Sequence, residues 1–208
     1  MENVSGDADE LRPEYTREDF GPMARGKIAA RMREPSISNF AGLKVRLAAT
    51  AIDFLIIAGY AALLAIASML LVRLTSFAQR FDSAITVDIL AFVTLILPVI
   101  LYFSLQEGSS RQATLGKHKM GLKVIDKEGG RLAFSRALLR SALKFLPWQL
   151  AHTAVLQIRF GHESYYIITL SILAQAIVII YILSILLDRQ HRAPYDWLAG
   201  SRVIRLPA

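Results

Sequence analysis

Residues Phe54 to Val72 read FLIIAGYAALLAIASMLLV, which is 19 consecutive residues without a charged side chain. In an α-helix each residue rises about 1.5 Å, so this segment is just long enough to cross a hydrocarbon core about 30 Å thick. A water-soluble domain of this size would not need such an uncharged block. The stretch therefore predicts a membrane-spanning helix.

Three further segments are candidates for spans. Tyr165 to Leu187 gives 23 uncharged residues, and Ile89 to Leu105 gives 17, which is at the lower end of what crosses a bilayer. Phe145 to Ile158 is shorter and contains polar residues, so hydropathy alone also allows an interfacial or re-entrant segment. With helix ends included, the expected spans are about 47–72, 88–105, 145–158 and 165–187.

The distribution of basic residues favours all four spans. Of the 24 Lys and Arg, 21 then fall in the first, third and fifth segments outside the membrane, and 3 fall in the second and fourth. Basic loops stay in the cytoplasm, so this asymmetry predicts a multi-pass protein of the cell (inner) membrane with both termini cytoplasmic. With three spans, the four basic residues after the last span would lie outside.

Composition also limits the classes of function. The net charge of +7 could suggest nucleic acid, but the basic residues follow the membrane flanks, so we expect no nucleic-acid partner. The lipid bilayer and its anionic headgroups are the expected partner. There is no cysteine, no His-Glu-x-x-His motif and no nucleophile elbow. We therefore expect no enzyme activity, and the sequence indicates no cofactor or metal.

The polar segments suggest the domain organisation. Residues 1–40 have no hydrophobic period and are expected to form a disordered cytoplasmic arm, ahead of a membrane domain over 41–208. Lys119 to Asp126, a turn at 127–130 and a return over 131–134 predict a small cytoplasmic β-hairpin.

A helix beginning near Ser135 is expected after the hairpin. In it Arg136, Arg140 and Lys144 recur every four residues, opposite a row of leucines. This pattern predicts an amphipathic interfacial helix on the inner leaflet. A basic face that is merely solvated explains the pattern equally well.

Asp53 lies at the start of the first span, where an unpaired carboxylate costs roughly 2.5 to 3.5 kcal/mol. Arg46 is on the same helix face, but it is two turns away and its side chain leans toward its own N-terminus, so the two do not pair within the helix. We expect a partner from another element, with three candidates: His152, Lys144 and Arg189. Asp53 is then a cation or proton site, or a structural carboxylate that fixes helix packing.

The third span carries a polar stripe, formed by Gln149, His152, Thr153 and Gln157. Their spacing places them on one helix face, which is expected to point into the bundle. His152 is suited to proton relay or to an interhelical hydrogen bond. In the second span, Pro98 frees the carbonyl of Thr94, which would bind a cation or simply mark a kink.

Four motifs in order resemble the RDD family: Arg46, Ala49 and Asp53; then TLGK at Thr114 to Lys117; then GLKVID at Gly121 to Asp126; and finally YDWLAGSRV at Tyr195 to Val203. The resemblance extends from about Ala41 to Ile204. The family is named for one arginine and two aspartates, which match Arg46, Asp53 and Asp196. The resemblance implies a multi-span membrane protein, and for some members it implies cation/proton exchange.

The resemblance also sharpens the expected geometry. Asp196 comes after the last span on the side where Arg46 begins the first, so the two are expected to pair. Ser201 to Arg205 would then add a strand to the hairpin. The expected fold is an all-α bundle of four transmembrane helices with a small cytoplasmic β element.

Two functional hypotheses are consistent with these patterns. In the first, the protein is a small-cation/proton exchanger that works as a homo-oligomer, with Asp53 as the exchange site and Arg46 and Asp196 at a cytoplasmic gate. In the second, it is a non-transporting accessory protein that binds a partner membrane protein or anionic lipid. Sites of either kind would draw on five residues: Arg46, Asp53, Gln149, His152 and Asp196.

Overall fold

The computed structural model describes residues 40–75, 83–161 and 164–206. The predicted disordered arm lies outside these residues, apart from Phe40. The described residues form eight helical elements and two strands, in the order α2 (Leu43–Leu74), α3 (Ala84–Ala91), η3 (Phe92–Ile96), α4 (Leu97–Glu107), α5 (Leu115–Lys119), β1 (Leu122–Asp126), α6 (Phe134–Arg159), α7 (Ser164–Leu187), α8 (Pro194–Ala199) and β2 (Ser201–Arg205).

Three of the described helices are long and apolar enough to cross a membrane. They are α2, the continuous helix formed by α3, η3 and α4, and α7 over Tyr165–Leu187. They coincide with three of the predicted spans. Many of their leucines and isoleucines are exposed, among them Leu55, Leu63 and Ile172, as expected for side chains that face lipid.

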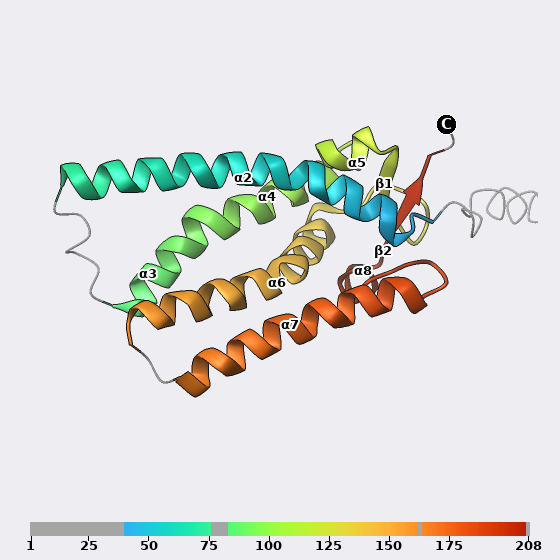
Figure 1. The fold of residues 1–208 in the computed structure, drawn as a ribbon. Helices are drawn as coiled ribbons and strands as arrows, with labels where there is room; N and C mark the ends of the chain where they lie inside the picture. The colour runs from blue at the N-terminus through green and yellow to red at the C-terminus, as the bar shows by residue number, and fades with distance from the viewer. Residues whose placement is uncertain (1–39, 76–82, 162–163, 207–208) are drawn as a thin grey trace, which may run out of the picture. The chain divides into compact units, whose positions relative to one another are not determined.

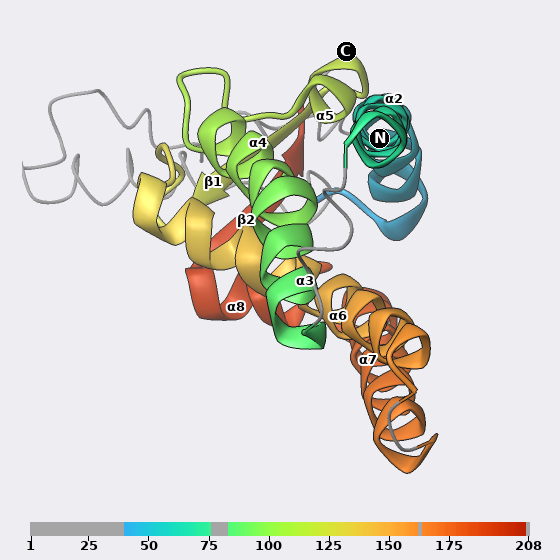
Figure 2. The ribbon, with the colours of Figure 1, turned by 90° about the vertical axis from the view of Figure 1, so that its left-hand side faces the viewer.

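α6 is a single helix of 26 residues that contains both the predicted interfacial helix and the predicted third span. The prediction of a separate interfacial helix is therefore wrong. Pro147 lies inside α6 and cannot donate to the carbonyl of Leu143, but Tyr181 on α7 donates its hydroxyl to that carbonyl at 2.7 Å. The helix continues through the proline and changes direction along its length (Figures 1 and 2).

The second proline is accommodated in the same way. Pro98 is the second residue of α4, which directly follows the short π-helical segment η3, and it frees the carbonyl of Thr94. Tyr60 on α2 donates its hydroxyl to this carbonyl. The carbonyl that the sequence offers as a cation ligand is thus used to join two helices.

The small sheet differs from the predicted hairpin. β1 pairs with β2 in antiparallel register, with Val124 opposite Val203. The turn after β1 forms, because Asp126 Oδ1 accepts the amides of Glu128 and Gly130. The return segment makes only an isolated bridge, between Ile125 and Arg131, so the hairpin is wrong.

The return segment is drawn away from β1 by the core and by α6. Leu132 is fully buried in the core beneath the sheet, and Phe134 already begins α6. The strand predicted over Ser201 to Arg205 takes the vacant edge of β1, which confirms that prediction. α5, β1, β2 and α8 lie together at one end of the helices, called the sheet end below (Figure 1).

Helix packing joins the sheet end to the rest of the bundle. α6 packs against α4, α7 and α8, and α2 packs against α5. The buried residues of α2 form one stripe at helical spacing: Arg46, Ala49, Asp53 and Ile57. Three of these four are the residues of the first sequence motif, so that motif marks the inward face of the helix.

Candidate functional site

Asp196 is held by two arginines at the sheet end. Its Oδ2 lies 2.9 Å from Arg46 Nη1, which confirms the predicted pairing, and its Oδ1 lies 2.8 Å from Arg140 Nε and Nη2. The amide of Ala193 donates to Oδ2 at 3.1 Å, and the hydroxyl of Ser201 donates to Oδ1 at 3.2 Å. Asp196 is 0% exposed, so it is a buried tie between the start of α2, the N-terminal part of α6 and α8.

Arg140 links this pair to a second carboxylate. Its Nη1 pairs with Glu107 Oε2 at the end of α4, and Lys117 of α5 pairs with the other oxygen, Glu107 Oε1. Glu107 is 0% exposed and Arg140 is 2% exposed. Arg140 therefore does not belong to a solvated or headgroup-facing basic surface, as its spacing with Arg136 and Lys144 had indicated.

The ion cluster is defined here as Arg46, Glu107, Lys117, Arg140 and Asp196. Burial alone would raise the pKa of Asp196, but the guanidinium groups of Arg140 and Arg46 hold it well below its usual range. Burial alone would lower the pKa of Arg140, but Asp196 and Glu107 raise it. Both groups therefore keep their charge, and in the cluster three basic side chains surround two carboxylates.

Asp53 accepts three hydrogen bonds from neutral groups and pairs with none of the candidates that the sequence offered. Its Oδ2 accepts the hydroxyl of Thr114 at 2.6 Å. Its Oδ1 accepts the amide of Gly116 at 2.8 Å and the hydroxyl of Tyr102 at 3.2 Å. These donors come from α5 and α4, so expecting a partner among His152, Lys144 and Arg189 was wrong.

The TLGK motif is the element that holds Asp53. Thr114 caps the N-terminus of α5, where its hydroxyl oxygen accepts the amide of Lys117 at 3.3 Å and its proton goes to Asp53. Gly116 faces α2 directly: a Cβ there would overlap the carbonyl oxygen of Ala49 and lie 2.9 Å from Asp53 Oδ1. The glycine is required because the two backbones approach this closely.

The polar stripe of α6 is divided between two environments. Gln149 Nε2 and Thr153 Oγ1 both contact Asp88 Oδ1, on α3, at 3.3 and 3.0 Å. Gln157 is buried as predicted. His152 does not contact Asp53, and its Nδ1 is buried without a hydrogen-bond partner among the described residues.

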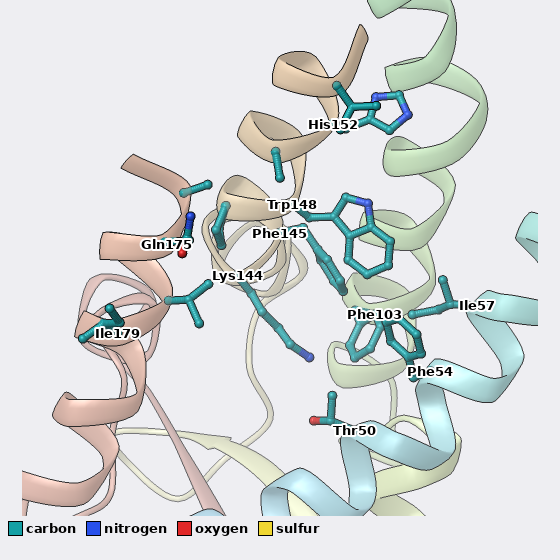
Figure 3. A pocket seen from close by; sticks show the side chains of 15 residues that line it. Thr50, Phe54, Ile57, Phe103, Lys144, Phe145, Trp148, His152, Gln175 and Ile179 are labelled. Carbon is teal, nitrogen blue, oxygen red and sulfur yellow. The ribbon is translucent and has the colours of Figure 1, made fainter. Parts of the chain in front are cut away.

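His152 lines a cavity of about 790 Å³ that α2, α4, α6 and α7 enclose (Figure 3). Its walls are mainly apolar, with Phe54, Phe145, Trp148 and Val178 among them. Several lining residues are themselves exposed, including Phe54 at 47% and Val155 at 64%. The cavity therefore opens on the apolar surface of the bundle rather than at its sheet end.

Two acidic residues of these contacts were not predicted from the sequence. Glu107 ends an apolar helix, where a charge resembles an ordinary span flank, and Asp88 lies near the other end of the same helix. The signal that could have found Glu107 is Lys117, a lysine in a motif with no carboxylate beside it in sequence. A partner had to come from elsewhere in the fold.

The fold and site define a class of protein: a membrane protein with several apolar helices and a buried ion cluster at one end. The model of the RDD family matches residues 40–200. The chain therefore belongs to the RDD family. No curated protein and no solved structure matches it.

Proposed function

We propose that this protein is a non-transporting accessory membrane protein, which presents an open apolar cavity to a lipid or to a neighbouring membrane protein. The observation that carries the proposal is the closure of the site. Asp53, Glu107 and Asp196 are each 0% exposed, and every one of their oxygens accepts from a protein donor. Such carboxylates fix geometry, and the surface that remains for a partner is the cavity.

The pairing at the sheet end supports four spans. β1 and β2 share one sheet, so both lie on one side of the membrane. α7 crosses once between them, and a second crossing is needed for the chain to return. α6 is the helix available for this second crossing, although its polar residues make it less apolar than the three helices named above.

The contacts of the sheet end also indicate how the first half of the chain crosses the membrane. Arg46 at the start of α2 pairs with Asp196 beside β2, so α2 begins on the side of the sheet. α2 and the α3–α4 helix then cross outward and back. With the basic loops at the sheet end, the positive-inside rule makes this the cytoplasmic side of a cell membrane.

The competing function is exchange of a small cation for protons at Asp53. One observation favours it: Asp53 is bound by neutral donors, so protonation there would break no ion pair. Against it, a cation entering this site would have to displace the Thr114 hydroxyl, the Gly116 amide or the Tyr102 hydroxyl.

The two functions separate in sealed proteoliposomes that contain a pH-sensitive dye. Na⁺, K⁺ or Li⁺ is added outside, and proton movement is compared for the wild type, Asp53→Asn and Asp188→Asn. The last is a matched control, because Asp188 pairs with Arg192 outside the cluster at 3.0 Å. We expect no flux above protein-free vesicles. Cation-driven flux that is lost in Asp53→Asn alone would establish exchange and overturn the accessory role.

A further inference from the structure

Lys144 is a basic residue of the bundle that does not belong to the ion cluster. Lys144 lies on α6, one turn after Arg140, and lines the cavity. Its Nζ is 3.8 Å from the centre of the Phe103 ring and 5.3 Å from that of Phe145. No carboxylate in the described part of the chain lies within ion-pair distance of it. An ammonium group in an apolar cavity is costly unless an anion accompanies it.

The cavity has a polar end and an apolar length. Figure 3 shows the Lys144 amine and the Thr50 hydroxyl at the same end, while aromatic and aliphatic side chains, together with His152 and Gln175, line the remainder. Along α6 the lining extends from Lys144 to Val155. At about 1.5 Å per residue this is roughly 16 Å, about half the thickness of a bilayer core.

The polar end and the apolar length of the cavity correspond to the headgroup and the acyl chain of a lipid in one leaflet. Lys144 is on the half of α6 nearest the sheet end, and the apolar length extends from it toward the opposite end of the helix. A phospholipid of the cytoplasmic leaflet has the same arrangement, with its headgroup at the rim and its chain directed to the midplane. We propose that the cavity binds an anionic phospholipid, with its phosphate on Lys144 and one acyl chain between α2 and α7.

The proposal rests on the accessory function and names its partner by chemistry. An ammonium group binds phosphate as a point charge, so a headgroup with net negative charge is preferred to a zwitterionic one. The exposed apolar residues at the mouth of the cavity, such as Phe54 and Val178, let the acyl chain enter from the bilayer.

Trp148 provides a reporter inside the cavity. The chain has two tryptophans, and Trp197 lies on α8, away from the cavity, so Trp197→Phe leaves Trp148 as the sole indole. The full chain with this substitution is reconstituted in phosphatidylcholine vesicles. Increasing fractions of phosphatidylglycerol or phosphatidylcholine with dibrominated acyl chains are included, and contact quenching of Trp148 fluorescence is measured.

We expect half-maximal quenching at an about fivefold lower mole fraction of phosphatidylglycerol than of phosphatidylcholine. Lys144→Gln should remove this preference and Lys144→Arg should keep it. Lys119→Gln is the matched control, because Lys119 is exposed on α5 and should keep the preference. The elution volume and the emission maximum of each variant check its fold. If the Lys144 variants fail to fold, the comparison of the two lipids in the protein that keeps Lys144 still tests the proposal.

Equal quenching by the two lipids would overturn the proposal. So would loss of the preference in Lys119→Gln as well as in Lys144→Gln, since that is a general effect of charge. Absence of quenching by either lipid would mean that protein, such as a second copy, covers Trp148, and this also overturns it. Proton flux is measured in the same vesicles, so a failed lipid site without flux leaves the accessory role standing.

Discussion

Gly116 is the residue at which α5 meets α2. Its missing side chain lets the amide reach Asp53, while the carbonyl of Ala49 occupies the place of a Cβ. Gly116→Ala should lower the free energy of unfolding by about 1–3 kcal/mol, because backbone has to move to admit the methyl group. The measurement is an SDS titration of the purified protein in mixed micelles.

Gly59 supplies the control for this substitution. It lies on α2, has open space around its Cβ position and has an ordinary helical backbone. Gly59→Ala should be neutral or stabilising by up to about 1 kcal/mol, since alanine is the better helix former. An equal loss of stability in both variants would contradict the close approach at Gly116.

Arg140 joins Asp196 to Glu107, so its removal leaves two buried carboxylates with one cation fewer. Arg140→Gln should cost about 3–5 kcal/mol of unfolding free energy, as breaking a buried pair does. Arg136, one turn earlier, is exposed, and Arg136→Gln should change stability by no more than about 0.5 kcal/mol. The same SDS titration measures both, and similar small effects would mean that Arg140 is solvated in the membrane-bound protein.

At the scale of elements, two prolines are matched by two tyrosines. The Tyr181 hydroxyl donates to the carbonyl freed by Pro147, and the Tyr60 hydroxyl donates to the one freed by Pro98. Tyr181→Phe should cost about 1 kcal/mol, because the Leu143 carbonyl then has no donor. Tyr166, exposed on the same helix, is the matched control, and Tyr166→Phe should have no effect.

A double-mutant cycle tests the connection between the tyrosine and the proline. In Pro147→Ala, the alanine amide can donate to the Leu143 carbonyl, so Tyr181→Phe should cost less in that background than in the wild type. Unfolding free energies of the four proteins give the coupling energy. Strict additivity would show that the hydroxyl stabilises the bundle independently of the proline.

Helices and strands could be predicted where a pattern of neighbouring residues in the sequence determines them. Uncharged runs predicted both ends of α7 and the C-terminal end of α2 closely, but α2 begins at Leu43, well before its uncharged run. Alternation identified β1, whereas β2 was expected from the pairing of Arg46 with Asp196. The hairpin prediction was wrong because Leu132 enters the core and Phe134 begins α6, so the return segment keeps only its bridge to Ile125. The partner strand β2 pairs with β1 from nearly eighty residues away in sequence, which no local pattern indicates. Arg140 looked like part of a basic surface because helical spacing cannot tell a solvated face from one that meets carboxylates of α4 and α8.

The site was predictable only in part, for the same reason. Arg46 and Asp196 were expected to pair because both flank spans on one side. The partners of Asp53 are a hydroxyl, an amide and a phenol, and such neutral groups leave no charge pattern to search for.

At the scale of the whole molecule, the proposed topology makes a direct prediction. The chain has no cysteine, so single cysteines can be introduced as Glu128→Cys, after β1, and Tyr165→Cys, at the start of α7. An impermeant maleimide should label position 165 in intact cells, and position 128 only after permeabilisation. Equal labelling of the two positions would mean that α6 does not cross the membrane.

The placement of Asp196 also has a consequence for biosynthesis. Arg46 and Arg140 leave the ribosome long before Asp196 does, so during insertion they are cations still waiting for their shared counter-ion. A nascent chain that stops short of α8 leaves Arg46 without a carboxylate and Arg140 with Glu107 alone, and a buried cation without its counter-ion is destabilising. The tie between the two ends of the domain can therefore form only after α8 has been synthesised.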